Sequence, residues 1–327
     1  MAISTVTRQY VVFFDGTGNT AEDRSEITNV FKMQELLLEQ QNRNSYYTPG
    51  VGTRVGEKLS GNVWGAGIRC RLEDAYRWLT DQMNYAGREL ETAQLYIFGF
   101  SRGAYIARVF CWLLYHCGVP DDANLCPRLS EWFLNGKNSE IEAWKSSHSH
   151  TGITGIEILG LWDTVKTADF GDLDLDDVKL APNVKNAFHA MALDELRNLF
   201  PVLRFNSDPR VHEVWFAGVH SDVGGGYPEP ESGLSNITLQ WMLDRAIEHG
   251  LSFRNQPPAQ DISQPRHDEY DKPLWQGLCR MKDFLHPAFH RPVQPADLVH
   301  ETVREKMEKF NYKPLAKFKT HPEFVPC

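Results

Sequence analysis

The chain has 327 residues, of which 42% are hydrophobic and 24% charged, a composition typical of a globular protein with a sizeable core. The formal net charge of −9 argues against a nucleic-acid partner, since nucleic-acid-binding proteins concentrate basic residues on one face. No apolar stretch has the length of a signal peptide or a membrane-spanning helix, so we expect a cytoplasmic chain as synthesised, with no cleaved leader.

The cysteines are scattered along the chain, and none forms a CxxC pair. We therefore expect free thiols in a reducing compartment and no zinc site, although the spacing leaves disulfide pairing open. The sequence does not specify an oligomeric state. The six residues are Cys70, Cys111, Cys117, Cys126, Cys279 and Cys327.

Short apolar runs alternate with amphipathic segments through the first 250 residues. Five runs are predicted to contain strands because they are short, apolar and bounded by turns: the start of QYVVFFDGTGNT, NSYYTPGVGT, QLYIFGF, GIEILGLWDTV and the apolar part of HEVWFAGVHSDVGGGY. Between and after them, apolar residues recur at helical spacing, which predicts helices over residues 29–40, 68–88, 104–117 and 236–249.

This alternation predicts an α/β fold like that of the α/β hydrolases, with a mostly parallel sheet covered by helices on both faces. We expect a single domain over residues 1–327, interrupted around 120–152 and 254–291 by irregular segments that are insertions or lids. The acidic run at 169–177 is expected to be a solvated loop, because its spacing does not match a calcium loop. Three aromatic residues of the first insertion could line an acyl pocket or simply pack in the core: Trp132, Phe133 and Trp144.

The segment Gly99-Phe100-Ser101-Arg102-Gly103 fits the G-x-S-x-G pattern and lies between a predicted strand and a predicted helix. A nucleophilic serine on such a sharp turn adopts strained backbone angles, and small neighbours avoid clashes where strand becomes helix. The helix N-terminus also places N–H groups and a partial positive charge beside the hydroxyl. The alternative is a serine that only caps the helix.

A serine nucleophile needs a base, and the base needs an acid to orient it. Of the twelve histidines, His220 stands out because it directly follows an apolar strand, and we expect SDVGGGY after it to be a flexible loop. Asp163 ends another predicted strand, and the order Ser101, Asp163, His220 is the order of α/β hydrolases. Asp163 could also merely cap the next segment, and Asp222 and Asp194 are rival acids.

Acyl transfer also requires donors for the developing oxyanion. One donor is expected to be the backbone N–H of Arg102, directly after the nucleophile, and the other the N–H of Gly16 or Thr17 in the FDGTGNT loop. Asp15 is expected to brace this loop by accepting hydrogen bonds from its N–H groups. A phosphate cradle is a weaker interpretation of the loop, which lacks both G-x-G-x-x-G and the Walker lysine.

Five segments occur together in this order: FFDGTGNT, GFSRGAYIAR, LGLWDTV, HAMALDELR and FAGVHSDVGGGY. Over residues 10–250 they resemble an α/β hydrolase family long labelled as an uncharacterised domain, which includes the phospholipase effectors of bacterial type VI secretion systems. The resemblance implies that Ser101, Asp163 and His220 form the catalytic triad and that the substrate is a fatty-acyl ester of a phospholipid. Those effectors are often longer, with an added membrane-targeting region, whereas this chain is close to a bare catalytic domain.

The sequence therefore predicts a serine hydrolase of carboxylic esters that forms an acyl-enzyme and needs no metal or organic cofactor. The expected substrate is an acyl ester or phospholipid, which leaves room for peripheral membrane contact, and a type VI-like machine could export the chain without a cleaved signal. A non-catalytic binding protein on the same scaffold remains an alternative. A thioesterase, peptidase or acyltransferase using the same triad is another.

Overall fold

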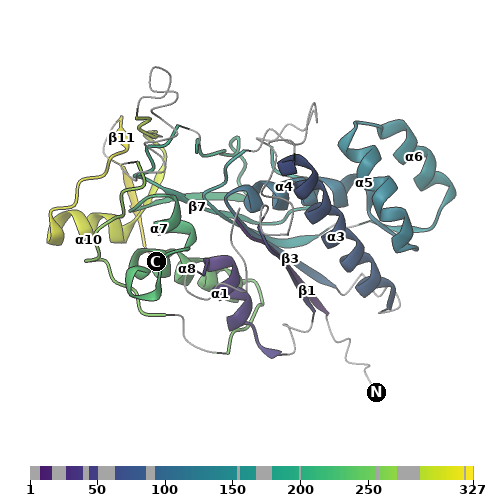
Figure 1. Cartoon of the computed structure of the whole chain (residues 1–327), viewed down its shortest axis with the longest axis horizontal. Helices are drawn as coiled ribbons and strands as arrows, with labels where there is room; N and C mark the ends of the chain where they lie inside the picture. Colours follow the sequence, from purple (N-terminus) through teal and green to yellow (C-terminus); the bar gives the residue numbers. More distant parts are fainter. Residues whose placement is uncertain are drawn as a thin grey trace.

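The computed structural model describes residues 8–16, 27–39, 44–50, 63–85, 93–152, 155–166, 179–198, 200–254, 258–270, 288–319 and 322–326 (Figure 1). Its centre is an eight-stranded sheet in which all neighbouring strands are parallel. From edge to edge the strands are β12 (Glu323–Val325), β10 (Leu298–His300), β8 (Val211–Phe216), β7 (Ala187–Ala192), β6 (Ile156–Trp162), β3 (Gln94–Phe100), β1 (Gln9–Phe14) and β2 (Ser45–Thr48).

Two short ribbons lie outside this sheet. One pairs β9 (Pro292–Val293) with β11 (Lys317–Phe318) in parallel, and the other pairs β4 (Val119–Pro120) with β5 (His150–Thr151) antiparallel. The helices are α1 (Asn29–Leu36), α3 (Val63–Tyr85), α4 (Arg102–Cys117), α5 (Cys126–Leu134), α6 (Asn138–Ser147), α7 (His220–Gly224), α8 (Gly233–Glu248) and α10 (Glu301–Phe310), with short 3-10 turns η2 (Ala123–Leu125) and η4 (Glu229–Glu231).

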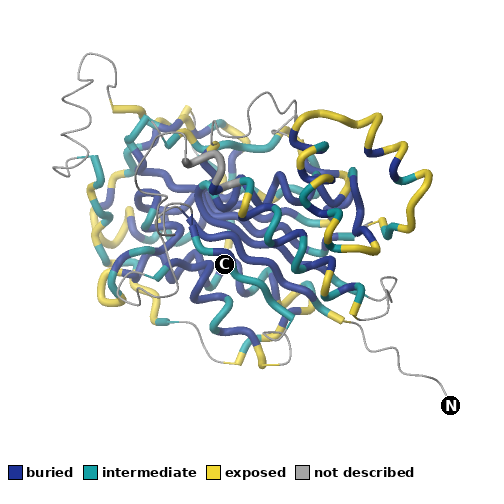
Figure 2. The backbone as a smooth tube through the Cα atoms, turned by 45° about the vertical axis from the view of Figure 1, so that its right-hand side comes forward, coloured by how far each residue is buried: buried dark blue, intermediate teal, exposed yellow. Residues whose placement is uncertain are grey.

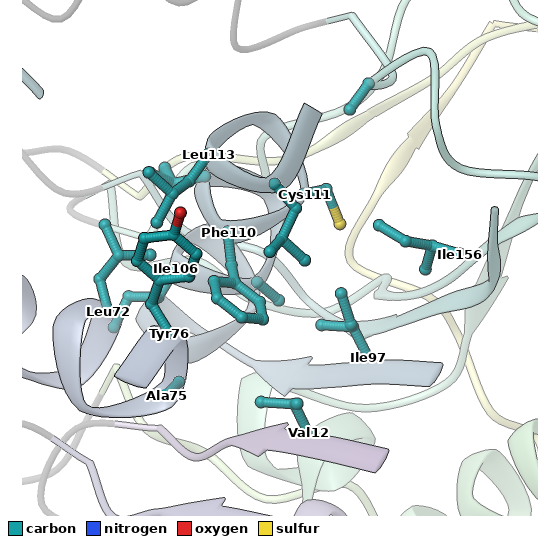
Figure 3. Close-up of a cluster of buried hydrophobic side chains, with 14 of the residues drawn as sticks. Val12, Leu72, Ala75, Tyr76, Ile97, Ile106, Phe110, Cys111, Leu113 and Ile156 are labelled. Atoms are coloured by element: carbon teal, nitrogen blue, oxygen red, sulfur yellow. The ribbon is translucent and has the colours of Figure 1, made fainter. Parts of the chain in front are cut away.

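Alternating side chains of β1 show how the helices cover both faces of the sheet. Tyr10, Val12 and Phe14 point into a core cluster with α3, α4, α5 and α6, whereas Val11 and Phe13 point into a second cluster with α1 and α8. Figure 3 shows the first cluster, where Val12, Ile97 and Ile156 from the strands meet side chains of α3 and α4. In Figure 2 the buried backbone is concentrated in this central sheet.

The predicted α/β fold with a mostly parallel sheet is confirmed. All four predicted helices are present, as α1, α3, α4 and α8, and the five predicted strands correspond to β1, β2, β3, β6 and β8. The prediction missed three strands of the sheet: β10 and β12 at one edge, and β7, the segment Ala187–Ala192, between β6 and β8. Every residue of β7 is buried, so it lacks the alternation of polar and apolar residues that marks a half-exposed strand.

The expectation that residues 120–152 are irregular is wrong. This segment forms the helices α5 and α6, which pack on the far side of α4 at one end of the molecule (Figure 1). Phe133 and Trp144 are buried in the first core cluster, and Trp132 packs against it. These aromatic residues therefore belong to the core, as one of the two alternatives stated. The helical periodicity was obscured by Pro127 and by the glycine turn between the helices.

In the second expected insertion, the described residues 258–270 contain no helix or strand, whereas residues 255–257 and 271–287 lie outside the described part of the chain. The acidic run at 169–177 also lies outside it. Cys70, Cys111, Cys117 and Cys126 are free, as expected, and Cys279 and Cys327 are not among the described residues. None of the helices described here is long and apolar enough to cross a membrane.

Candidate active site

Ser101 lies on a sharp turn where β3 becomes α4. Its backbone angles, φ 57° and ψ −125°, are unusual for a residue with a side chain, and strain of this kind characterises a nucleophile elbow. The Ser101 side chain makes no capping hydrogen bond to the helix, although the residue occupies the N-cap position. This geometry favours the elbow over the alternative of a simple helix cap.

The two glycines of the elbow are required by close backbone approach. A Cβ atom at Gly99 would lie 2.7 Å from the Gly103 carbonyl oxygen. At Gly103, a Cβ atom would come within 2.5 Å of the Asp15 carbonyl oxygen and still closer to that of Phe14. The elbow therefore packs directly against the end of β1, which brings the Asp15–Gly16 turn beside the N-terminus of α4.

We expect Gly103→Ala to destabilise the fold by about 1–3 kcal/mol, because the added methyl group meets backbone atoms that cannot rotate away. The matched control is Gly152→Ala, since a Cβ atom at Gly152 has no neighbour within 4 Å. Urea unfolding of the two variants measures the difference. Equal unfolding midpoints for both variants would show that the elbow tolerates a side chain at position 103.

Asp163 and His220 form a short hydrogen bond at the carboxyl edge of the sheet, from two strands separated by β7. Asp163 directly follows β6, the neighbour of β3, and His220 begins α7 after β8. The imidazole Nδ1 lies 2.6 Å from Asp163 Oδ2. Because an ionised carboxylate only accepts hydrogen bonds, Nδ1 carries the proton, and Nε2 is left as the basic nitrogen.

The backbone ties this pair to Ser101. The Ser101 N–H donates to the carbonyl of Trp162, the residue before Asp163, and the Val165 N–H donates to the Ser101 carbonyl. The His220 ring packs against Phe100, the residue preceding Ser101, with ring centroids 4.6 Å apart. The structure therefore brings all three predicted triad residues to one edge of the sheet.

Asp163 is fully buried and is held by four donors. Arg291 donates to both oxygens, from Nη1 to Oδ1 at 2.6 Å and from Nη2 to Oδ2 at 3.0 Å. The backbone N–H of Ala192 donates to Oδ1, and His220 completes the set. Burial raises the pKa of Asp163, but the positive charge of Arg291 and the hydrogen bond to His220 outweigh burial and hold that pKa well below its usual range.

The expectation of a flexible loop around His220 is wrong, because His220 is the first residue of the short helix α7. Its ring is held between aromatic neighbours, Phe100 and Phe200, the latter in an edge-to-face contact at 5.1 Å. Two glycines after the helix, Gly225 and Gly226, take positive φ angles and turn the chain toward α8. The base is therefore positioned by packing.

Both rival acids are engaged elsewhere. Asp222 Oδ2 accepts the N–H of Val219 at the start of α7, and Oδ1 lies 2.6 Å from Nδ1 of His267. Asp194 accepts hydrogen bonds from the Gly218 N–H, the Leu315 N–H and the Tyr312 hydroxyl. Asp222 thus supports the helix that carries His220, and the carboxylate on the imidazole of His220 is Asp163.

The turn after β1 differs in one respect from the expected oxyanion loop. Asp15 is buried and accepts hydrogen bonds from the hydroxyls of Thr28 and Tyr47, two partners that the sequence did not predict. Its Oδ1 also accepts the Gly16 N–H at 2.6 Å, the expected bond to an N–H of the loop, so this candidate oxyanion donor already has a partner. Arg102 is the first residue of α4, where backbone N–H groups point out of the helix. Thr17 lies outside the described residues.

Burial raises the pKa of Asp15 from 3.8 to about 6, despite hydrogen bonds from Tyr47, Thr28 and Gly16 that favour the carboxylate. The folded protein then binds this proton more tightly than the unfolded chain, so the contribution of Asp15 to the free energy of unfolding falls as pH rises from about 4 to about 6. For Asp15→Asn, which cannot titrate, we expect this fall of about 3 kcal/mol to disappear.

Urea unfolding at pH 4, 5, 6 and 7 measures this change in pH dependence. The exposed Asp121→Asn serves as the control and is expected to follow the wild-type profile. Parallel profiles for Asp15→Asn and the wild type would contradict the expected titration.

Comparison with known protein families identifies the family of this chain. A family model described as the catalytic domain of Tle1-like phospholipase effectors of the type VI secretion system matches residues 8–245. The chain belongs to this Tle1-like family. The matched range contains all the residues predicted from sequence for the site, whereas Arg291 and His267 lie beyond it.

Two solved structures are similar to the chain. An uncharacterized protein from Pseudomonas aeruginosa is 20% identical, with a TM-score of 0.45, over 80% of this chain and 48% of its own. The Tle1 effector bound to the VgrG spike of the type 6 secretion system is 22% identical, with a TM-score of 0.42, over 70% of this chain and 53% of its own. This Tle1-like chain therefore spans about half the length of the solved structures it matches.

A local sequence match extends the comparison to yeast. An uncharacterized protein of Saccharomyces cerevisiae is 48% identical over 54 residues, which are 16% of this chain and 8% of that protein.

Sequence reasoning missed several residues that hold the site. Arg291 lies 128 positions from Asp163, in a segment without a recognisable motif. Glu195 accepts the backbone N–H of His220 at 3.3 Å and is held by Arg197. The HAMALDELR segment, which contains Glu195, was the one available signal. The described residues contain no group of three or more His, Cys, Asp or Glu side chains arranged to hold a metal ion.

Proposed function

We propose that this chain is a single-domain serine hydrolase that cleaves acyl esters of phospholipids through an acyl-enzyme. Ser101 is the nucleophile, His220 the general base and Asp163 the acid that orients the base. The observation that carries the proposal is the 2.6 Å hydrogen bond between Asp163 and His220 beside a serine with φ 57°. Membership of a family named for phospholipase effectors supports the substrate class.

The proposed reaction begins when His220 Nε2 takes the proton of the Ser101 hydroxyl as Oγ attacks the ester carbonyl. Asp163 accepts the Nδ1–H and stabilises the imidazolium that forms. His220 then protonates the leaving alcohol, and the acyl group stays on Oγ. A water molecule, deprotonated by the same imidazole, attacks this ester and releases the fatty acid.

For the oxyanion we propose the backbone N–H of Arg102 as one donor, at the N-terminus of α4. We assign the second to Thr17 in preference to Gly16, because the Gly16 N–H donates to Asp15. Asp15, anchored by Tyr47 and Thr28, would then support the hole through the turn that it braces. The mechanism requires no metal or organic cofactor.

A phospholipid substrate requires the enzyme to work at a membrane surface, so we propose peripheral contact with a bilayer during turnover. Membership of a type VI effector family supports export by such a system. The solved Tle1 effector is bound to a VgrG spike, and a spike protein is the corresponding proposal for a carrier of this chain.

Fatty-acid release from phospholipid vesicles, together with a series of soluble acyl esters of increasing chain length, tests the proposed substrate class. We expect turnover of both, with Ser101→Ala inactive. Turnover of thioesters or peptides alone would favour a thioesterase or peptidase on the same triad, and transfer to an added alcohol an acyltransferase. A folded protein that neither turns over any substrate nor reacts with a fluorophosphonate would favour a binding protein.

A further inference from the structure

Arg291 is fully buried, and its guanidinium donates hydrogen bonds to Asp163 of the candidate active site and to two backbone carbonyls. Nη1 donates to Asp163 Oδ1 at 2.6 Å and to the Ala192 carbonyl at 2.8 Å. Nη2 donates to Asp163 Oδ2 at 3.0 Å and to the Phe200 carbonyl at 2.8 Å. A planar guanidinium that bonds both oxygens of a carboxylate fixes the plane of that carboxylate, which a lysine cannot do.

The chain around Arg291 is itself anchored. Arg291 directly precedes β9, and its carbonyl accepts the N–H of Lys317 at the start of β11. The preceding His290 places Nδ1 2.7 Å from the Leu315 carbonyl. The β9–β11 ribbon thus holds the arginine against the end of the sheet, and it does so from a segment beyond the family match, which ends at residue 245.

Asp163 accepts hydrogen bonds from both Arg291 and His220. The guanidinium bonds both oxygens, and the imidazole of His220 bonds Oδ2 from the other side. A fixed positive charge about 3 Å from the carboxylate opposes the uptake of a further proton by the Asp163–His220 pair, whichever of the two receives it. Removal of that charge therefore makes the pair easier to protonate.

Three other carboxylates near the Asp163–His220 pair are each bonded to a basic side chain. Glu195 accepts the His220 N–H and is bonded through both oxygens by Arg197, which also lies 3.8 Å from Glu269. On the far side of α7, Asp222 is paired with His267, which also lies 3.1 Å from Glu231. His189, behind Asp163, accepts the Thr164 N–H and is paired with Glu213. Arg291 is the cation in direct contact with the triad carboxylate.

We propose that Arg291 is a positioning residue of the Asp163–His220 pair, with two separable effects. Its fork fixes the carboxylate so that Oδ2 faces Nδ1 of His220, and its charge keeps the pair unprotonated, and His220 available as a base, at lower pH. The inference rests on the proposed function of Ser101 and His220.

The test is the second-order rate constant for fluorophosphonate labelling between pH 5 and 9, measured for the wild type, Arg291→Gln and Arg291→Lys. Arg291→Gln removes the charge, and we expect the midpoint of the acid limb to move up by about one pH unit or more. Arg291→Lys keeps the charge and loses the fork, so we expect an unchanged midpoint and a plateau rate about 10- to 100-fold lower. Urea unfolding shows whether each variant is folded.

The results separate this inference from the proposed function. Absence of Ser101-dependent labelling in the wild type would overturn the proposed function and the inference with it. A wild type that labels, with both variants at the wild-type midpoint or shifted equally, would overturn the role of Arg291 alone. If Arg291→Gln does not fold, Arg291→Lys decides: a wild-type plateau rate or a shifted midpoint contradicts the inference, and a slow reaction with the wild-type midpoint supports it.

Discussion

Ser101→Ala is expected to reduce ester hydrolysis by about 10⁶-fold, to the level left by substrate binding and the oxyanion donors alone. The reason is that Ser101 carries the only hydroxyl of the turn Gly99–Gly103 between β3 and α4, where its φ of 57° is that of a nucleophile elbow. The loss of activity is measured as fatty-acid release from phospholipid vesicles at pH 8, by the wild type and by Ser101→Ala.

The structure offers a matched control for this variant. Ser139 is an exposed serine on α6, where its hydroxyl donates to the carboxylate of the neighbouring Glu140. Ser139→Ala is expected to keep the wild-type rate. Residual activity of Ser101→Ala above a few per cent would mean that another group attacks the ester.

Asp163→Asn is expected to have the second largest effect, because it damages both catalysis and the fold. An amide NH₂ in place of either oxygen faces the N–H groups of Arg291, and at Oδ2 it also opposes the Nδ1–H of His220. The wrong imidazole tautomer lowers kcat by about 10⁴-fold in other serine triads. A buried guanidinium left without its counter-ion costs about 3–5 kcal/mol of stability.

The stability loss has a defined pH dependence. Because the pKa of Asp163 is lowered in the folded protein, its contribution to stability is present above the unfolded value near 4 and is lost as pH falls. The difference in unfolding free energy between wild type and Asp163→Asn should therefore be largest near pH 7 and shrink below about pH 4. Asp208→Asn, which removes a surface ion pair with Arg210, is the control and should cost at most about 1 kcal/mol. A pH-independent difference for Asp163→Asn would contradict this account.

The sequence predicted the parts of the site that depend on local signals. The elbow around Ser101 was recognisable because glycines flank a serine between a strand and a helix. Asp163 and His220 were recognisable because each follows an apolar strand or its short extension, and parallel strands bring their carboxyl ends to one edge. The parallel sheet and five of its eight strands followed from the alternation of short apolar runs and amphipathic helices.

What the sequence did not predict depends on long-range packing. Arg291 reaches Asp163 only because the β9–β11 ribbon folds back over the end of the sheet, and no local pattern encodes that return. The partner of Asp222 was also missed, because His267 lies in an irregular segment. Asp15 was expected to accept an N–H of its own loop, but the sequence did not show that this would be the Gly16 N–H, a candidate oxyanion donor. In each case the choice among several polar groups was made by geometry that residue types alone do not specify.

The most direct test of the central claim is to map the covalent adduct after reaction with a fluorophosphonate. Intact-mass measurement followed by peptide sequencing should find one adduct per chain, on Ser101 within the segment Gly99–Gly103. The variants Ser101→Ala and Asp163→Asn should show none or very little over the same time. An adduct on another residue, or none on a folded and correctly buffered wild type, would contradict the proposed hydrolase.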